Sequence, residues 1–217
     1  MTPSLPSIVL RAPRWRKGLS ALLLTGLCFS LLLSGTGTAA AAAATDESSW
    51  TLDRLMSTLA QKKSGHASFV ETKYLSIAAK PIESRGELAF TAPDHLEKQT
   101  DSPKPERLVV DGDMLTVERN ARKYTVSLTH YPELEAFIES IRATLAGDRP
   151  ALERTYRVSI EGHGDAWTLT LAPLDSRMLK AVRTIKLEGT RDVLRTVIIE
   201  QADGDHSVMR LHDAAGQ

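Results

Sequence analysis

Residues 65–93 read GHASFVETKYLSIAAKPIESRGELAFTAP. The stretch is rich in valine, isoleucine, tyrosine, phenylalanine and threonine, which favour the pleated surface of a sheet. It predicts two strands, at 66–78 and 84–92. Because proline has no amide hydrogen to donate to a ladder, Ala92-Pro93 ends the second strand. No residue in the stretch has an obvious catalytic role, so the function of such a sheet has to be sought in its shape.

Short strands and tight turns continue to the end of the chain. Asp111-Gly112-Asp113 separates two apolar runs, and Asp-Gly in that position is a strong hairpin signal. Further strands are predicted from near His95, and at 106–110, 114–119, 123–128, 156–161, 167–171, 181–188, 193–200 and 206–212. Strands and helices do not alternate as in a parallel sheet, so the pattern indicates about nine or ten antiparallel strands.

Two segments have the apolar spacing of a helix. The first runs from a Thr51 cap to an end at Gly65 and carries one apolar stripe, made of Leu52, Leu55, Met56 and Leu59. The second begins at Pro132 and ends at Gly147. Its stripe is Leu134, Phe137, Ile138, Ile141 and Leu145. A single stripe buries a single face, so each helix is expected to lie on the sheet.

These elements predict an α+β fold that is mostly β. A sheet with this many strands curls or closes. The economical arrangement is a strongly curved antiparallel sheet, an incomplete β-barrel, with the helices as a lid over its concave side. The interior would be aliphatic, which suits acyl chains. The alternative interpretation is that the same side chains fill a dry core.

The N-terminal 44 residues have the order of a secretory signal peptide. Four basic residues precede an apolar run at 19–33, and a small-residue tract follows at 35–44. An uncleaved anchor is the alternative, but the run is short for a membrane span. Cys28 lies inside this run and after Leu27, so it is expected to leave with the signal. Residues 45–217 then form one domain without a disulfide, in the periplasm of a Gram-negative bacterium.

Charge and motifs exclude several classes of function. The leader holds four of the 27 Lys and Arg and none of the 27 Asp and Glu, so the remainder is acidic by four charges, which argues against nucleic acid as a partner. The later histidines lack the spacing of a metal site, and Asp111 and Asp113 lack the rest of a calcium loop. No cofactor is expected. An enzyme that uses Glu71 or Glu188 stays as a minor alternative.

Four motifs in order resemble the periplasmic lipoprotein carrier family of the LolA type. They are His66-Ala67-Ser68-Phe69 after an amphipathic helix, Gly86-Glu87-Leu88 before Pro93, the hairpin from Leu108 to Leu115, and Trp167 to Pro173. The resemblance covers about residues 66–212. It implies an incomplete barrel closed by a helical lid, with an interior that holds the acyl chains of lipoproteins crossing the periplasm.

The sequence departs from the family at three places. The resemblance implies an arginine before the proline of the second strand, bonded to the lid, and here that residue is Ala92. Thr116 replaces an aromatic residue of the hairpin. The sequence given also stops near its last strand, without the family's C-terminal docking segment. The sequence is therefore interpreted as a divergent member with its own control of the lid.

The predicted function is a periplasmic carrier, not an enzyme, that shelters the acyl chains of a lipoprotein or other lipidated cargo on the way to the outer membrane. An inner-membrane donor and an outer-membrane acceptor are the implied partners of a monomer. A lipid sensor of the same fold is the alternative. The residues predicted to line the cavity and lid are Leu88, Phe90, Leu115, Val117, Leu134, Phe137, Ile138, Ile141, Leu169 and Leu171.

Overall fold

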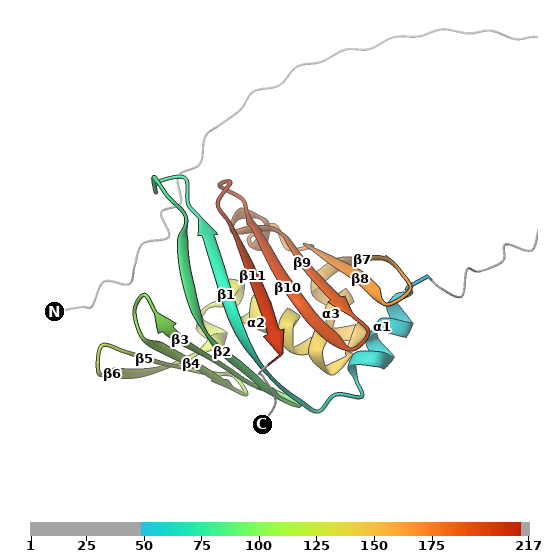
Figure 1. The fold of residues 1–217 in the computed structure, drawn as a ribbon, viewed down its shortest axis with the longest axis horizontal. Helices are drawn as coiled ribbons and strands as arrows, with labels where there is room; N and C mark the ends of the chain where they lie inside the picture. The colour runs from blue at the N-terminus through green and yellow to red at the C-terminus, as the bar shows by residue number, and fades with distance from the viewer. Residues whose placement is uncertain (1–48, 214–217) are drawn as a thin grey trace, which may run out of the picture. The chain divides into compact units, whose positions relative to one another are not determined.

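The structure is a computed structural model that describes residues 49–213 (Figure 1). The predicted signal peptide and Cys28 lie outside these residues. The α-helices described are α1 (Leu52–Leu59), α2 (Pro132–Ala146) and α3 (Arg149–Thr155), with short 3-10 turns η1 (Leu128–His130) and η2 (Met178–Lys180). The strands described are β1 (Ser64–Tyr74), β2 (Ile82–Thr91), β3 (His95–Ser102), β4 (Glu106–Asp111), β5 (Met114–Arg119), β6 (Arg122–Ser127), β7 (Tyr156–His163), β8 (Ala166–Pro173), β9 (Val182–Thr190), β10 (Val193–Gln201) and β11 (His206–Asp213).

All eleven of these strands form one antiparallel sheet. Its order is β6-β5-β4-β3-β2-β1-β11-β10-β9-β8-β7, so β1 to β6 form one meander and β7 to β11 another. The two meanders meet where β1 pairs with β11, from Ala67 opposite Asp213 to Tyr74 opposite His206. The sheet is curved and unclosed, and α1, α2 and α3 lie on the same side of it (Figure 1). The predicted fold class is thus confirmed.

The ends of the helices follow local chemistry. Thr51 caps α1, as predicted, by accepting a hydrogen bond from the Arg54 amide at 3.2 Å. Pro132 opens α2 and Gly147 closes it in the left-handed conformation, with φ 69°. A β-carbon on Gly147 would also collide with the Met56 carbonyl oxygen, so this glycine lets the end of α2 approach α1.

Four details of the sequence prediction are wrong. The first strand ends at Tyr74 rather than at residue 78, because the chain already turns toward β2 after Tyr74. Gly65 does not end the first helix, because α1 stops at the cap residue Ala60 and Gly65 already lies in β1. The sixth strand stops before Leu128, which begins η1. The helix α3 was not predicted, because seven residues are too few to show a periodic stripe. Its signals are Asp148, whose carboxylate accepts from the Ala151 amide at 3.0 Å, and Pro150 in the first turn.

The register divides the side chains of the sheet between two faces. We call the face covered by helices the inner face and the opposite one the outer face. Trp167, Leu169 and Leu171 of β8 are all buried, and their partners Leu187 and Ile185 of β9 are buried beside them on the inner face. The helices and this face together form the packed interior. None of the helices within residues 49–213 has the length and apolar character needed to cross a bilayer.

The outer face of the first meander carries a ladder of alternating charges. Arg107 donates to Glu97 at 2.6 Å and lies 3.7 Å from Glu118, which in turn lies 2.8 Å from Lys123. The hydrogen bond from Arg107 lowers the pKa of Glu97, and the one from Lys123 lowers the pKa of Glu118. Such a ladder stabilises the β3 to β6 pairing and keeps this face polar.

Gly86 is a point of close approach in the middle of the sheet. It lies on β2 at a register shift between β2 and β3, and a β-carbon there would collide with the backbone carbonyl oxygen of Gln99. Because the obstacle is backbone, a rotamer change cannot relieve it. The glycine is therefore required by the contact between two strands, and not by an unusual φ.

We expect Gly86→Ala to lower the free energy of unfolding by about 2 kcal/mol or more, since the two strands must separate to admit the methyl group. Gly65→Ala is the matched control, because no atom lies within 4 Å of the β-carbon it would add. Urea unfolding followed by circular dichroism measures both. Equal stability of the two variants would contradict the close approach.

The lowered pKa of Glu97 predicts a pH dependence. A carboxyl group whose pKa is lower in the folded state adds stability above its unfolded pKa and loses it as the pH falls through the folded value. Arg107→Gln should therefore destabilise the protein at neutral pH, and the difference from the wild type should shrink below the ordinary glutamate pKa of 4.5. Unfolding curves at several pH values test this, with the exposed Lys104→Gln as control. A difference that stays constant down to about pH 3 would refute it.

Candidate functional site

The inner face carries two separate hydrophobic clusters. The larger, which we call the C-terminal cluster, joins α1, α3 and strands β7 to β9 with Ala143 of α2, and includes Leu169 and Leu171. The smaller, the N-terminal cluster, joins β4, β5, η1 and α2, and is made of Val110, Leu115, Val117, Leu128 and Ile138. One sheet thus supports two packed regions rather than one continuous core.

Helix α2 connects the two clusters. Phe137 packs against both of them, and Ile138 belongs to the N-terminal one. The hydroxyl of Tyr156 on β7 donates to the Ala136 carbonyl at 3.1 Å, and burial raises the pKa of this tyrosine. One turn of α2 therefore contacts both clusters and is hydrogen-bonded to β7.

The central strands between the clusters supply further apolar side chains. Phe69 of β1, Phe90 of β2 and Leu211 of β11 are buried, yet they belong to neither of the two clusters. Leu88 and Met209 are half-buried on the same face. We call these five residues the central strip. Helix α2 lies over this strip (Figure 1). The strip is therefore an apolar part of the inner face that belongs to neither packed cluster.

The structure places the ten predicted site residues as follows. Phe90, Leu115, Val117, Ile138, Leu169 and Leu171 are buried, and Leu88, Phe137 and Ile141 are half-buried. Leu134 is 36% exposed. Leu115, Val117 and Ile138 come together in the N-terminal cluster, and Leu169 and Leu171 lie in the other. Their role in binding acyl chains stays a prediction.

Sequence reasoning missed Phe69 and Leu211 as members of this face. Phe69 is 1% exposed and lies opposite both Gly86 and Leu211. The alternation of β1 puts Phe69 on the same face as Glu71. Because a charged residue on one face of a strand normally indicates an exposed face, the pattern did not predict that Phe69 is buried. Leu211 could be placed only once the pairing of the first and last strands was known.

A buried ion pair borders the central strip. Glu71 is 4% exposed, and its carboxylate lies 2.7 Å from Lys98 Nζ, 3.6 Å from Lys73 Nζ and 3.4 Å from the Ser84 hydroxyl. Lys98 also lies 4.8 Å from the centre of the Phe69 ring. Removing one partner of such a pair would leave a buried charge without compensation. The apolar part of the inner face therefore ends at Glu71 and Lys98.

The lid is fastened by an arginine of its own. Ala92, which stands where the resemblance implies an arginine, is half-buried and carries no polar side chain. Instead, Arg142 of α2 donates to the Gly112 carbonyl oxygen at 3.2 Å and lies 3.8 Å from the Asp94 carboxylate, with only 12% of its side chain exposed. We call this contact the Arg142 latch. It joins the lid to the loop after Pro93 and to the β4–β5 turn.

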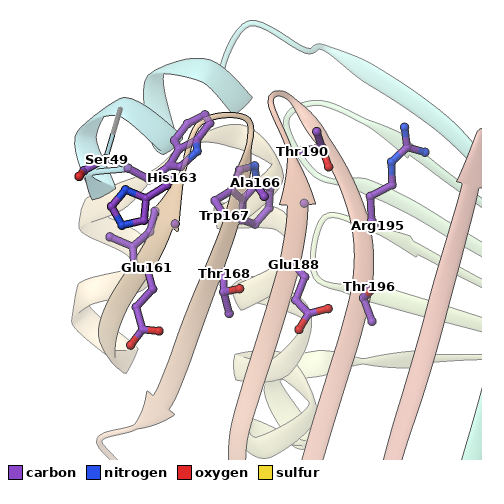
Figure 2. Close-up of a pocket in the computed structure, with 14 residues that line it drawn as sticks. Ser49, Glu161, His163, Ala166, Trp167, Thr168, Glu188, Thr190, Arg195 and Thr196 are labelled. Carbon is purple, nitrogen blue, oxygen red and sulfur yellow. The ribbon is translucent and has the colours of Figure 1, made fainter. Parts of the chain in front are cut away.

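Glu188, the other candidate carboxylate, lies on the opposite side of the sheet. It faces a broad, open depression of about 850 Å³ on the β7 to β10 half of the sheet (Figure 2). Glu161, Thr168, Glu188 and Thr196 follow one another across four strands in a single row. Glu71, the alternative carboxylate of the enzyme hypothesis, is on the inner face instead, so the hypothesis concerns two different places in the sheet.

The described part of the chain shows no group of three or more His, Cys, Asp or Glu side chains placed to hold a metal ion. The Asp111-Gly112-Asp113 segment forms the β4–β5 hairpin turn, with Gly112 at φ 55°. The hairpin prediction is therefore confirmed for this segment.

Comparison with known proteins gives one family and several distant structures. No curated protein matches the chain. The crystal structure of a LolA superfamily protein from Nitrosomonas europaea is 12% identical, with a TM-score of 0.42, and covers 75% of this chain and 90% of that one. The MucA/MucB complex of Pseudomonas aeruginosa is 14% identical, with a TM-score of 0.41, over 76% of this chain and 56% of that one. LprF from Mycobacterium bovis is 11% identical, with a TM-score of 0.31, over 76% and 94%.

The family model described as "Outer membrane lipoprotein carrier protein LolA-like" matches residues 39–217. This match takes in every helix and strand described above, including both clusters, the central strip and the Arg142 latch. The chain therefore belongs to this LolA-like family.

Proposed function

We propose that this protein is a periplasmic carrier that shelters the acyl chains of a lipoprotein or another lipidated molecule between α2 and the central strip. The observation that carries the proposal is the division of the inner face into two clusters bridged by one helix. A single packed core would resist opening throughout. With two clusters, α2 can separate from the strip by withdrawing Ile138 from the N-terminal cluster and Ala143 from the C-terminal cluster, while the members of each cluster that lie outside α2 keep their packing.

The energetics favour such a site. Each CH₂ group of an acyl chain gains about 0.8 kcal/mol when it leaves water for an apolar surface. Leu88 and Met209 of the strip and Ile141 of α2 are half-buried, so a hydrocarbon between them would complete the burial of side chains that are now partly wet. The ligand would thereby add contacts that these half-buried side chains make only in part within the protein.

The Arg142 latch gives the lid a reversible fastening. Its hydrogen bond is to a carbonyl oxygen of a turn, and its charge partner Asp94 is 42% exposed in its side chain. Partly solvated contacts of this kind contribute only about 1 kcal/mol each, which holds a lid closed without preventing its opening. On this proposal the latch takes the place of the arginine missing at Ala92 and sets the rate of cargo release.

Cargo passes from a donor at the inner membrane to an acceptor at the outer membrane, and the carrier performs no covalent chemistry. The ion pair of Glu71 and Lys98 supports this view, because the carboxylate already has a charged partner at 2.7 Å. The pair would contact the polar end of the cargo where the apolar strip ends. The carrier acts as a monomer, and nucleic acid is no partner.

We expect Ile138→Glu to abolish the retention of lipid, because it places a charge on the inner side of the lid, where Ile138 is 7% exposed. Ile141→Gln, at a half-buried position, should lower the retained lipid about fivefold or more with little effect on folding. The measurement is mass spectrometry of organic extracts of the purified protein. Leu179→Glu, at a residue 44% exposed, is the control. An unchanged amount of extracted lipid in both lid variants would contradict the proposed site.

Arg142→Gln should loosen the lid and speed the release of bound lipid about fivefold, in line with the loss of about 1 kcal/mol of fastening. Transfer of a fluorescent fatty acid from the protein to acceptor vesicles measures this rate. Lys104→Gln removes a positive charge from an exposed loop and serves as control. A release rate equal to that of the wild type would show that the latch does not limit opening.

A further inference from the structure

The β1–β2 hairpin ends in an exposed apolar turn, which we call the ribbon tip and define as residues 74–82. Ile77 is 93% exposed, and Tyr74 and Ile82 are 41% and 43% exposed. Ala78, Ala79 and Pro81 complete a turn whose only basic residue is Lys80. Isolated exposed apolar residues need no explanation, but several in one turn indicate a contact surface.

The tip projects beyond its neighbours. Ladder pairing of β2 with β3 begins only at Arg85, whereas pairing with β1 continues to Ile82 opposite Lys73. Figure 1 shows the turn at the end of the β1–β2 ribbon, next to the turn between β10 and β11. The exposed isoleucine therefore sits at the end of a narrow ribbon rather than on a broad face.

Specific contacts hold the tip in this position. The Ser76 amide donates to the Asp205 carboxylate at 2.7 Å, and the Ala78 amide donates to the Leu75 carbonyl at 3.0 Å. The Tyr74 ring stacks on His206 with 4.4 Å between ring centres. The turn is thus tied to the neighbouring hairpin while Ile77 stays in water, although burying it elsewhere would be favourable.

The charges around the tip have no dominant sign. Lys73 and Lys80 are basic, whereas Asp203 and Asp205 of the neighbouring turn are acidic. Lys73 lies 3.6 Å from Glu71. The tip can therefore attract a partner mainly through its apolar side chains, which Tyr74, Lys73 and Lys80 surround. Tyrosine and lysine side chains around an apolar centre suit the headgroup region of a membrane, because they bury apolar atoms and keep their polar ends in water.

The size of the tip decides between a protein and a lipid surface. A stable protein interface buries roughly 800 Å² on each partner, with about twenty residues or more. A two-stranded ribbon with three exposed large apolar side chains cannot supply that area. Insertion into a bilayer needs no matching surface, only apolar side chains that leave water.

We propose that the ribbon tip inserts into a phospholipid surface, with Ile77 reaching the acyl region and Tyr74 and Lys80 staying among the headgroups. This inference deepens the proposed function, on which it rests for its purpose: contact with the membrane would hold the carrier near the donor and the acceptor with which it exchanges cargo. A few apolar side chains give a weak, reversible contact, since even a single myristoyl chain binds only marginally. Such a contact lets the carrier leave again.

The test is flotation of the full chain, as secreted into the periplasm of an expression host, with vesicles of phosphatidylethanolamine and phosphatidylglycerol. The wild-type protein should float with the vesicles. Ile77→Asp should lower the bound fraction about tenfold at limiting lipid, since it replaces the aliphatic side chain that would enter the bilayer by a charged one. Leu174→Asp, at a residue 50% exposed on another part of the chain, is the matched control and should float like the wild type.

A second variant reports insertion directly. Ile77→Trp should float at least as well as the wild type, and the fluorescence of the added indole should shift to the blue and be quenched by brominated phospholipids. Equal flotation of Ile77→Asp and the wild type would overturn the inference, as would an indole signal in the Ile77→Trp variant that vesicles leave unchanged. Lipid co-purified with Ile77→Asp should equal that of the wild type, so failure of the tip and failure of the proposed cargo site are distinguishable.

Discussion

The pairing of β1 with β11 is the interaction on which the rest of the structure depends. Each meander assembles from contacts between neighbours in sequence, but these two strands lie more than 130 residues apart, and closing that loop costs conformational entropy. The pairing makes one inner face from two half-sheets. Only then can α2 lie across both, with Phe137 packed against the N-terminal and the C-terminal clusters.

The difference between contacts of neighbouring residues and contacts of distant ones explains what the sequence could predict. Gly112 in its turn, Pro132 and Gly147 at the ends of α2, and the alternation in β8 are local signals, and the elements they indicate are present. The latch of Arg142 on Gly112 and the ion pair of Lys98 with Glu71 join residues about thirty positions apart, and no pattern within one element reveals them. The two-cluster interior was hidden for the same reason.

Glycine and arginine positions show how a divergent family member keeps a shape while it changes the details. Gly86 belongs to a motif of the resemblance and has a steric reason to be there, because the Gln99 carbonyl leaves no room for a methyl group. Ala92 departs from the resemblance, and Arg142 brings a guanidinium to the same region from the opposite partner, the lid. The contact of Gly86 with the backbone of Gln99 allows only glycine. The arginine contact between the lid and the sheet can instead be made by an arginine on either element.

The proposed carrier would have to bind hydrocarbon strongly and still release it, and on this proposal different parts of the inner face would meet the two demands. The clusters at the two ends, with residues such as Leu169 at 0% exposure, provide stability that does not depend on cargo. On the proposed function, a hydrocarbon between α2 and the central strip would cover Leu88, Met209 and Ile141, which are half-buried without it. Because Glu71 and Lys98 end the apolar region, a bound chain would meet a polar boundary beside Phe69, which limits how far it can slide. On the proposed function, the length of the strip would set the affinity for the cargo, and the Arg142 latch would set the rate of its release.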